Sequence, residues 1–253
     1  MHGFWAVFKR ELKSYFTTPL AYVFLVVFLA ASGHMAFKRG FFEARQADMQ
    51  AFFLDLPLVF FLIVPATAMR LWAEERKTGS IELLLTLPIT VVQAILGKFF
   101  AAWIFLGIAL ALTFPMVITV SYLGNPDVGP IITGYLGSWL MAGGFLAIGC
   151  FFSTITKNQV IAFVLSVVAC AVLVYSDDPT TIRFMSGLIP PFLARYVMSA
   201  IATVSAIVSV SFRVHFEATL RGLLQFKDLA YFVLLMVGWL VASMIVLDER
   251  KAS

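Results

Sequence analysis

Charged residues are scarce in this sequence, and hydrophobic residues are abundant. Asp, Glu, Lys and Arg make up 13% of the 253 residues, whereas hydrophobic residues make up 61%. Soluble domains carry about 25% charged and about 45–50% apolar residues, so the composition excludes a soluble globular domain. The formal net charge of +4 is small and dispersed along the chain, which argues against a nucleic-acid partner.

Residue types that build metal or enzymatic centres are also sparse. The two cysteines, Cys150 and Cys170, both lie inside apolar runs, so the chain has no disulfide framework. No two of the three histidines have the spacing of metal ligands, and we predict no metal site. The phosphate-loop pattern G-x-x-x-x-G-K-S/T is absent, so any ATP hydrolysis must take place on another subunit.

No ionisable residue lies clearly at the centre of an apolar run. Transporters driven by protons or sodium ions usually place a carboxylate or histidine there, so this class is disfavoured. Arg70 and Lys98 lie at the ends of apolar runs, and we expect their side chains to extend to the membrane surface.

Long apolar runs dominate the sequence instead. A helix needs about 20 apolar residues to cross a bilayer. Backbone groups in lipid must be hydrogen-bonded within the protein, so each run is predicted to be helical. We therefore predict an all-α fold, a polytopic bundle of six transmembrane helices that forms one domain over residues 1–253, with a kink at Pro115. The predicted spans are residues 19–37, 54–72, 99–123, 131–152, 160–175 and 229–247.

Residues 196–212 are apolar but rich in small polar side chains, and Arg195 and Arg213 bracket them. This composition fits either a seventh span or a re-entrant or surface helical hairpin between the fifth and sixth spans. A seventh span would place the two termini on opposite sides of the membrane. Pro190-Pro191 suits the hairpin, and we favour that interpretation.

The N-terminal residues 1–18 predict an interfacial helix rather than a cleaved signal peptide. Apolar side chains recur there at helical spacing, and basic side chains occupy the other faces. A helix of this kind lies on an anionic membrane leaflet. The residues of the predicted interfacial helix are Phe4, Phe8, Lys9, Arg10 and Leu12.

The most informative loop follows the second span and covers residues 74–95. Gly79 and Ser80 are suited to break one helix and cap the next, and Glu82 then falls in the first turn, where the helix dipole favours a carboxylate. A charged entrance and an apolar face predict docking on another protein; periodicity alone fits a short helix on the lipid surface equally well. The predicted docking residues are Glu74, Glu75, Lys77, Gly79, Ser80, Glu82, Leu83, Leu84, Leu87 and Pro88.

This segment resembles the signature of ABC-2 type transporter permeases. In that family an acidic-basic cluster, a glycine and a Glu-Leu-Leu-Leu-x-Leu-Pro run follow the second span, as they do here. The resemblance extends to Lys98-Phe99 and to the leading Phe8-Lys9-Arg10-Glu11-Leu12, and so covers essentially the whole chain. Four residues before the last span are similar to the gliding-motility (GldF-like) subgroup of these permeases: His215, Phe216, Arg221 and Asp228. We expect Arg221 and Asp228 to pair.

The resemblance implies that separate subunits form the membrane path and bind ATP. Family members have six spans with both termini in the cytoplasm, and a second permease copy, identical or different, completes a central path. Each permease binds an ABC ATPase subunit, two copies per complex, so the partner holds ATP and Mg²⁺ and this chain binds no cofactor. Residues 176–228 would be extracytoplasmic and would receive a periplasmic or membrane-anchored auxiliary subunit at a bacterial inner membrane.

Two other functions fit the composition. An intramembrane enzyme acting on lipid would need polar groups near one leaflet, and only the outer segment, with Asp177 and His215, offers them. A membrane anchor for a periplasmic partner would have a dispensable outer segment. The resemblance favours a non-enzymatic permease subunit that couples ATP hydrolysis to export or to mechanical signalling.

Overall fold

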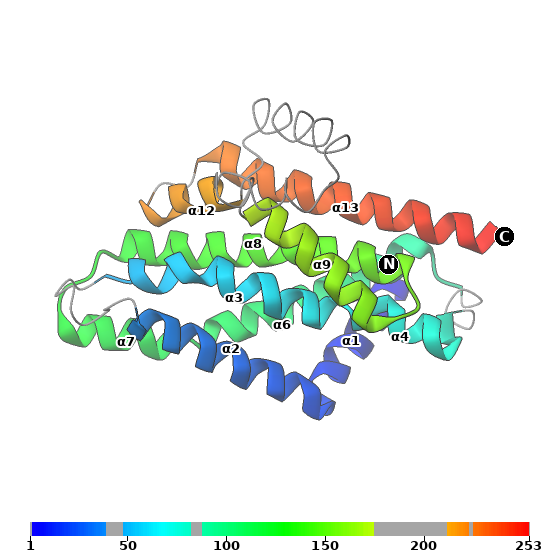
Figure 1. Ribbon diagram of the computed structural model, residues 1–253, viewed down its shortest axis with the longest axis horizontal. Coiled ribbons are helices and arrows are strands. Elements are labelled where there is room, and N and C mark those ends of the chain that lie inside the picture. Colours follow the sequence, from blue (N-terminus) through cyan, green and yellow to red (C-terminus); the bar gives the residue numbers. More distant parts are fainter. Residues whose placement is uncertain (1, 39–47, 82–87, 175–211, 223–224, 253) are drawn as a thin grey trace, which may run out of the picture.

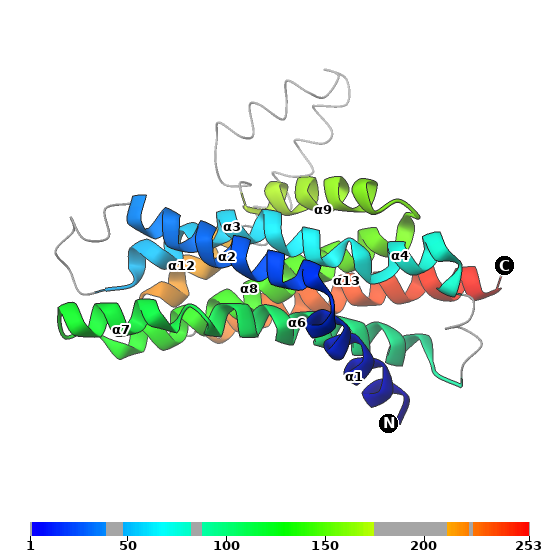
Figure 2. The same cartoon turned by 90° about the horizontal axis from the view of Figure 1, so that it is seen from below.

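The computed structural model describes residues 2–38, 48–81, 88–174, 212–222 and 225–252, and every element assigned in these ranges is an α-helix. The helices are α1 (His2–Thr17), α2 (Pro19–Lys38), α3 (Gln50–Ala68), α4 (Arg70–Thr78), α6 (Val91–Ala111), α7 (Phe114–Leu123), α8 (Val128–Ile155), α9 (Gln159–Val174), α12 (Phe212–Leu220) and α13 (Phe226–Ala252). Most of the helices run side by side along one long axis, and α1 crosses it obliquely (Figures 1 and 2).

Five helical stretches of the described chain, two of them made of two consecutive helices, are long and apolar enough to cross a membrane: Pro19–Lys38, Gln50–Thr78, Val91–Leu123, Val128–Ile155 and Phe226–Glu249. The predicted fifth span corresponds to α9, which is apolar but has only 16 residues. These 16 residues end where the described range ends and rise about 24 Å at 1.5 Å per residue, against roughly 30 Å for a hydrocarbon core. The multi-pass helical fold is therefore confirmed, whereas the six-span count and the hairpin at 196–212, most of which lies outside the described residues, stay predictions.

The third span differs from its predicted form. It begins at Val91 rather than at residue 99, because Thr90 and Gln93 form a capping box at its start. It is also two helices rather than one kinked helix, since α6 ends at Ala111 and α7 begins at Phe114. Pro115 has no N–H to donate, and its ring clashes with the preceding turn, which favours a break there.

Helix α8 is the centre of the bundle, and α3, α6, α9, α12 and α13 all pack against it. Its glycines allow these close approaches: a Cβ on Gly149 would come within 2.4 Å of Ala68, and one on Gly143 within 2.8 Å of Trp103. Gly143 and Ala147, a small-xxx-small pair, are both buried. Their contacts are with helices of the same chain, so this pair serves packing within the monomer.

Helix α1 packs along α6 instead of projecting from the bundle. Val7 is 6% exposed, and a Cβ on Gly97 would lie 2.9 Å from it. The ring of Phe4 meets that of Phe100 edge to face at 6.1 Å. The start of α1, the end of α13 and helix α4 lie at one end of the long axis, as Figures 1 and 2 show.

Candidate functional site

Helix α4 is anchored to the end of α8 by two side-chain contacts. The hydroxyl of Ser153 accepts hydrogen bonds from the backbone N–H groups of Trp72 and Ala73, each at 3.0 Å, and donates one to the carbonyl of Met69. These are donors that the start of a helix otherwise leaves unsatisfied. Farther along α4, Arg76 Nη1 donates to the carbonyl of Thr154 at 2.6 Å. Both ends of α4 are therefore fixed relative to the central helix.

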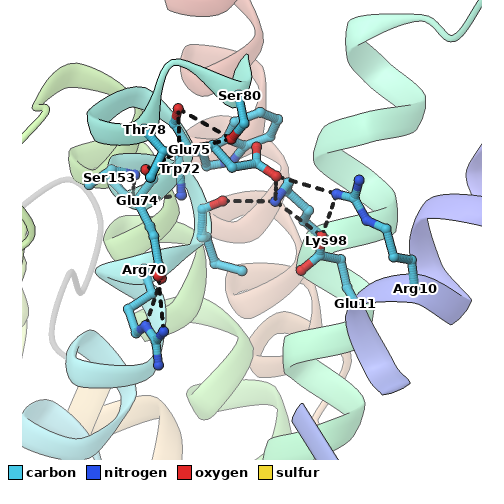
Figure 3. A network of polar contacts seen from close by, with 12 residues as sticks. Arg10, Glu11, Arg70, Trp72, Glu74, Glu75, Thr78, Ser80, Lys98 and Ser153 are labelled. Atoms are coloured by element: carbon cyan, nitrogen blue, oxygen red, sulfur yellow. Dashed lines mark hydrogen bonds and ion pairs between the residues drawn. The ribbon is translucent and has the colours of Figure 1, made fainter. Parts of the chain in front are cut away.

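A buried lysine joins α4 to α6 and α1. The side chain of Lys98, on α6, is 2% exposed, and its Nζ lies 2.9 Å from Glu75 Oε1 on α4 and 3.2 Å from Glu11 Oε1 on α1. The same Nζ donates to the carbonyl of Leu71 at 3.0 Å. Figure 3 shows these groups converging on the ammonium from three separate helices. All three ammonium donors are thus used.

Arg10 closes the cluster on its outer side. Its Nη2 lies 2.7 Å from Glu11 Oε1 and 3.3 Å from Glu75 Oε1, and its side chain is 52% exposed (Figure 3). Two cations therefore face two carboxylates. We call Arg10, Glu11, Glu75 and Lys98 the charged junction.

The electrostatics of the charged junction favour its ionised form. Burial by itself raises the pKa of Glu11, but the charges of Lys98 and Arg10 outweigh it and hold the pKa below the ordinary value. Burial likewise opposes the charge of Arg10, and the neighbouring carboxylates overcome it and raise its pKa. Because a buried ion is costly when unpaired, each member of the junction depends on the others.

Of the remaining residues predicted for docking, some have contacts within the chain, some are exposed, and some lie outside the described residues. The carboxylate of Glu74 accepts hydrogen bonds from Nε and Nη2 of Arg70 at 2.8 and 3.1 Å. Lys77 is exposed. The hydroxyl of Ser80 lies 3.0 Å from the hydroxyl of Thr78. Gly79 ends α4 in the left-handed region at φ 74°, the helix break expected from the sequence. Pro88 is exposed. Glu82, Leu83, Leu84 and Leu87 lie outside the described residues.

One basic residue departs from its predicted surroundings. Lys98 was expected at the membrane surface and is instead enclosed by carboxylates. Arg70 pairs with Glu74, and its place at the membrane surface stays a prediction. Sequence reasoning placed Arg10 and Glu11 on the leading helix that resembles the family, and it predicted no contact for Glu11 or Ser153. The signal for Glu11 was its place between basic residues on α1, but no pattern in the sequence indicated its distant partner on α6. Phe8 and Leu12 are partly buried, and Lys9 is exposed.

A second polar cluster lies near the opposite end of the bundle. His215 Nδ1 and Asp228 Oδ1 are 2.6 Å apart, with side-chain exposures of 11% and 3%, and the imidazole stacks on Tyr231 at 4.1 Å. Phe216 is buried beside them, 1% exposed. Arg221 is exposed and lines a separate cavity of about 270 Å³ with Asp48 and Asp127. The predicted pairing of Arg221 with Asp228 is therefore wrong, since the carboxylate bonds His215.

The comparison with known families agrees with this membrane architecture. A sequence model described as "ABC-2 family transporter protein" matches residues 42–247. A comparison with curated proteins gives no match. The family match does not distinguish subgroups, so the gliding-motility assignment stays a prediction. With most of its length matched, the chain belongs to the ABC-2 family of transporter proteins and is a membrane-spanning permease subunit.

Proposed function

We propose that this permease couples ATP hydrolysis on a separate ABC ATPase to movement of its own helices. The ATPase, present in two copies, docks on the end of α4 and the segment that follows it. A second permease copy completes the path across the membrane. The output is export or mechanical signalling to an extracytoplasmic partner, and both termini face the cytoplasm.

The charged junction is the observation that carries this proposal. It joins α1, α4 and α6, while Ser153 and Arg76 join α4 to α8, the helix around which the bundle packs. A force applied at the end of α4 therefore acts on four helices together. Packed interiors respond to such forces as rigid bodies, because close-packed side chains do not deform continuously.

The end of α4 suits a docking surface. Lys77, Thr78 and Gly79 are exposed there, beyond the last anchored residue, Arg76. The sequence that follows is the Glu-Leu-Leu-Leu-x-Leu-Pro run that resembles the family signature. An exposed polar entrance followed by an apolar sequence fits a protein partner better than the lipid surface.

Co-purification tests the docking assignment. The chain is tagged and expressed with a candidate ATPase, and the ATPase is measured in the eluate. We expect stoichiometric retention that is lost when Leu83 and Leu84 become Asp. Leu123→Asp, an exposed position (57%) at the opposite end of the bundle, is the matched control and should retain the ATPase. An ATPase retained by the Leu83 and Leu84 variant would place the docking surface elsewhere.

The same experiment separates the rival functions. If a folded, monodisperse permease never retains an ATPase, the lipid-acting enzyme or the membrane anchor becomes the better explanation. The enzyme alternative has little support at the described outer cluster, because His215 and Asp228 are buried and bonded to each other. Asp177 lies outside the described residues.

A further inference from the structure

A small polar cavity lies where α1 meets α2, beside the charged junction. Its volume is about 100 Å³, room for about three water molecules. It is lined from α1, α2, α3 and α4, and the lining residues that matter here are Glu11, Ser14, Tyr15, Leu20, Arg70 and Glu74. The cavity is open on one side, so a small headgroup that joins a phosphate to an ammonium can enter it, whereas a bulky headgroup does not fit.

The cavity presents hydrogen-bond donors that the described chain leaves unused. Arg70 binds Glu74 through Nε and Nη2, and Nη1 has no partner among the described residues. The Tyr15 hydroxyl has none there either, while its ring is held by stacking on Phe105 at 4.7 Å. Burial raises the pKa of Tyr15, so the phenol stays a donor. Tyr15, Arg70 and Glu11 line the same small cavity.

Each charged residue that lines the cavity is already paired. Arg70 pairs with Glu74, and Glu11 belongs to the charged junction, in which two cations face two carboxylates. A ligand with a net charge would upset this balance in a partly buried site. A zwitterion leaves it intact, because its anionic group meets the unused donors and its cationic group meets the carboxylates.

The cavity continues into an apolar strip on α2. Leu20 lines the cavity, and Val23 and Val27 follow it on one helix face at i+3 and i+7. They are 36%, 53% and 49% exposed, respectively. The joint between a charged helix and an apolar span is the depth at which lipid headgroups lie. A headgroup in the cavity therefore has a path for its acyl chains along α2.

We propose that this cavity binds the headgroup of a membrane lipid that carries a phosphate and a primary amine. The phosphate accepts hydrogen bonds from Arg70 and Tyr15, and the ammonium donates to Glu74. The lipid would wedge between α1, α2 and α4, next to the charged junction. This inference does not depend on ATPase docking and holds for the isolated chain.

Native mass spectrometry of the purified protein tests the site. The chain is titrated with phosphatidylethanolamine, phosphatidylcholine and phosphatidylglycerol of equal chain length. We expect phosphatidylethanolamine to bind about tenfold more tightly than the other two, since the choline group has no N–H and the glycerol group has no cation. Equal affinities for the three lipids would overturn the proposal.

Matched variants locate the binding. Arg70→Gln should weaken phosphatidylethanolamine binding about tenfold, whereas Arg213→Gln, in a similar i,i+4 pair with Glu217 on α12, should leave it unchanged. Tyr15→Phe removes only the hydroxyl and keeps the stack on Phe105, so a severalfold loss in this folded variant supports the site. No change in both Arg70→Gln and Tyr15→Phe would refute it.

Soluble competitors separate a lipid site from a free-ligand site. Glycerophosphoethanolamine should displace the lipid only at high concentration, because it lacks the acyl chains that pack on Val23 and Val27. Displacement by inorganic phosphate at similar concentrations would show a simple anion site and contradict the zwitterion assignment.

Discussion

At the residue scale, the burial of Lys98 is stable only because every ammonium proton has an acceptor. Two carboxylates and the Leu71 carbonyl supply these acceptors, and the Trp72 ring lies 5.0 Å from the Nζ. An ammonium in such a place without partners would shed its charge or unfold the site. A charged Lys98 therefore requires that α1 and α4 stay packed against α6.

Replacing Lys98 by Met tests this dependence. The substitution leaves the carboxylates of Glu11 and Glu75 facing each other without Lys98, and breaking a buried ion pair costs about 3–5 kcal/mol. The side chains of Glu11 and Glu75 keep 17% and 18% exposure, so we expect the lower end of that range. Thermal unfolding in detergent measures the loss. Lys98→Met with Glu75→Gln should recover part of it, and a double variant less stable than the single one would contradict the pairing.

The pKa of Glu11 predicts how the junction responds to acid. Because the folded-state pKa lies below the ordinary 4.5, the stabilisation is complete above pH 4.5 and is lost as the pH falls toward the folded value. We expect the protection of the α1 backbone amides, measured relative to the intrinsic exchange rate at each pH, to fall below about pH 4.5. Glu11→Gln should exchange faster at neutral pH and show less change on acidification. A wild-type α1 whose protection is constant down to pH 3 would refute this.

At the element scale, most of the helices follow from the sequence, and their junctions do not. Run length located α2, α3, α8, α9 and α13 because lipid demands continuous apolar helices. The start of α6 was missed, since Gln93 and Lys98 interrupt the apolar pattern. Gln93 serves the capping box, and a distant ion pair makes the burial of Lys98 favourable. Contacts between segments far apart in the chain leave no periodic signal, and the charged junction is made of such contacts.

The contact of α6 with α8 is fixed by two tryptophans. Trp103 and Trp139 stack at 4.3 Å, and each indole N–H donates to the backbone carbonyl of the other residue. Gly143 lies against Trp103 and Met236, and a Cβ there would come within 2.8 Å of the indole nitrogen and 2.5 Å of the sulfur. Met236 can adjust, but the doubly bonded tryptophan cannot move without losing hydrogen bonds.

Gly143→Ala should therefore destabilise the protein. Overpacking of this kind costs about 1–3 kcal/mol. Gly238→Ala is the matched control, because α13 offers nothing within 4 Å of a Cβ at Gly238 and alanine favours a helix. The midpoint of thermal unfolding should be lower for Gly143→Ala than for Gly238→Ala. If both variants shift equally, the close approach of α6 and α8 does not constrain the bundle.

At the scale of the whole molecule, the two ends of the bundle differ in character. One end holds α1, α4, the charged junction and the start and finish of the described chain (Figure 2). The other holds α12 with the His215–Asp228 pair. Helices α3, α6, α8 and α13 connect the ends, and α8 contacts α3, α6 and α13. Motion that begins at α4 reaches the far end only if these helices move together.

A disulfide between α1 and α6 tests whether they move as one body. A Cβ at Gly97 would lie 3.0 Å from the Cβ of Val7, so a shift of several tenths of an ångström gives the usual separation of about 3.8 Å for Val7→Cys with Gly97→Cys. Cys150 and Cys170 are buried and do not compete. If α1 and α6 act as a rigid pair, the oxidised variant should retain full ATPase-coupled activity in proteoliposomes, equal to its reduced form. Loss of coupling on oxidation, restored by dithiothreitol, would show instead that α1 slides along α6 during the cycle, and the charged junction would then be a contact that breaks and re-forms.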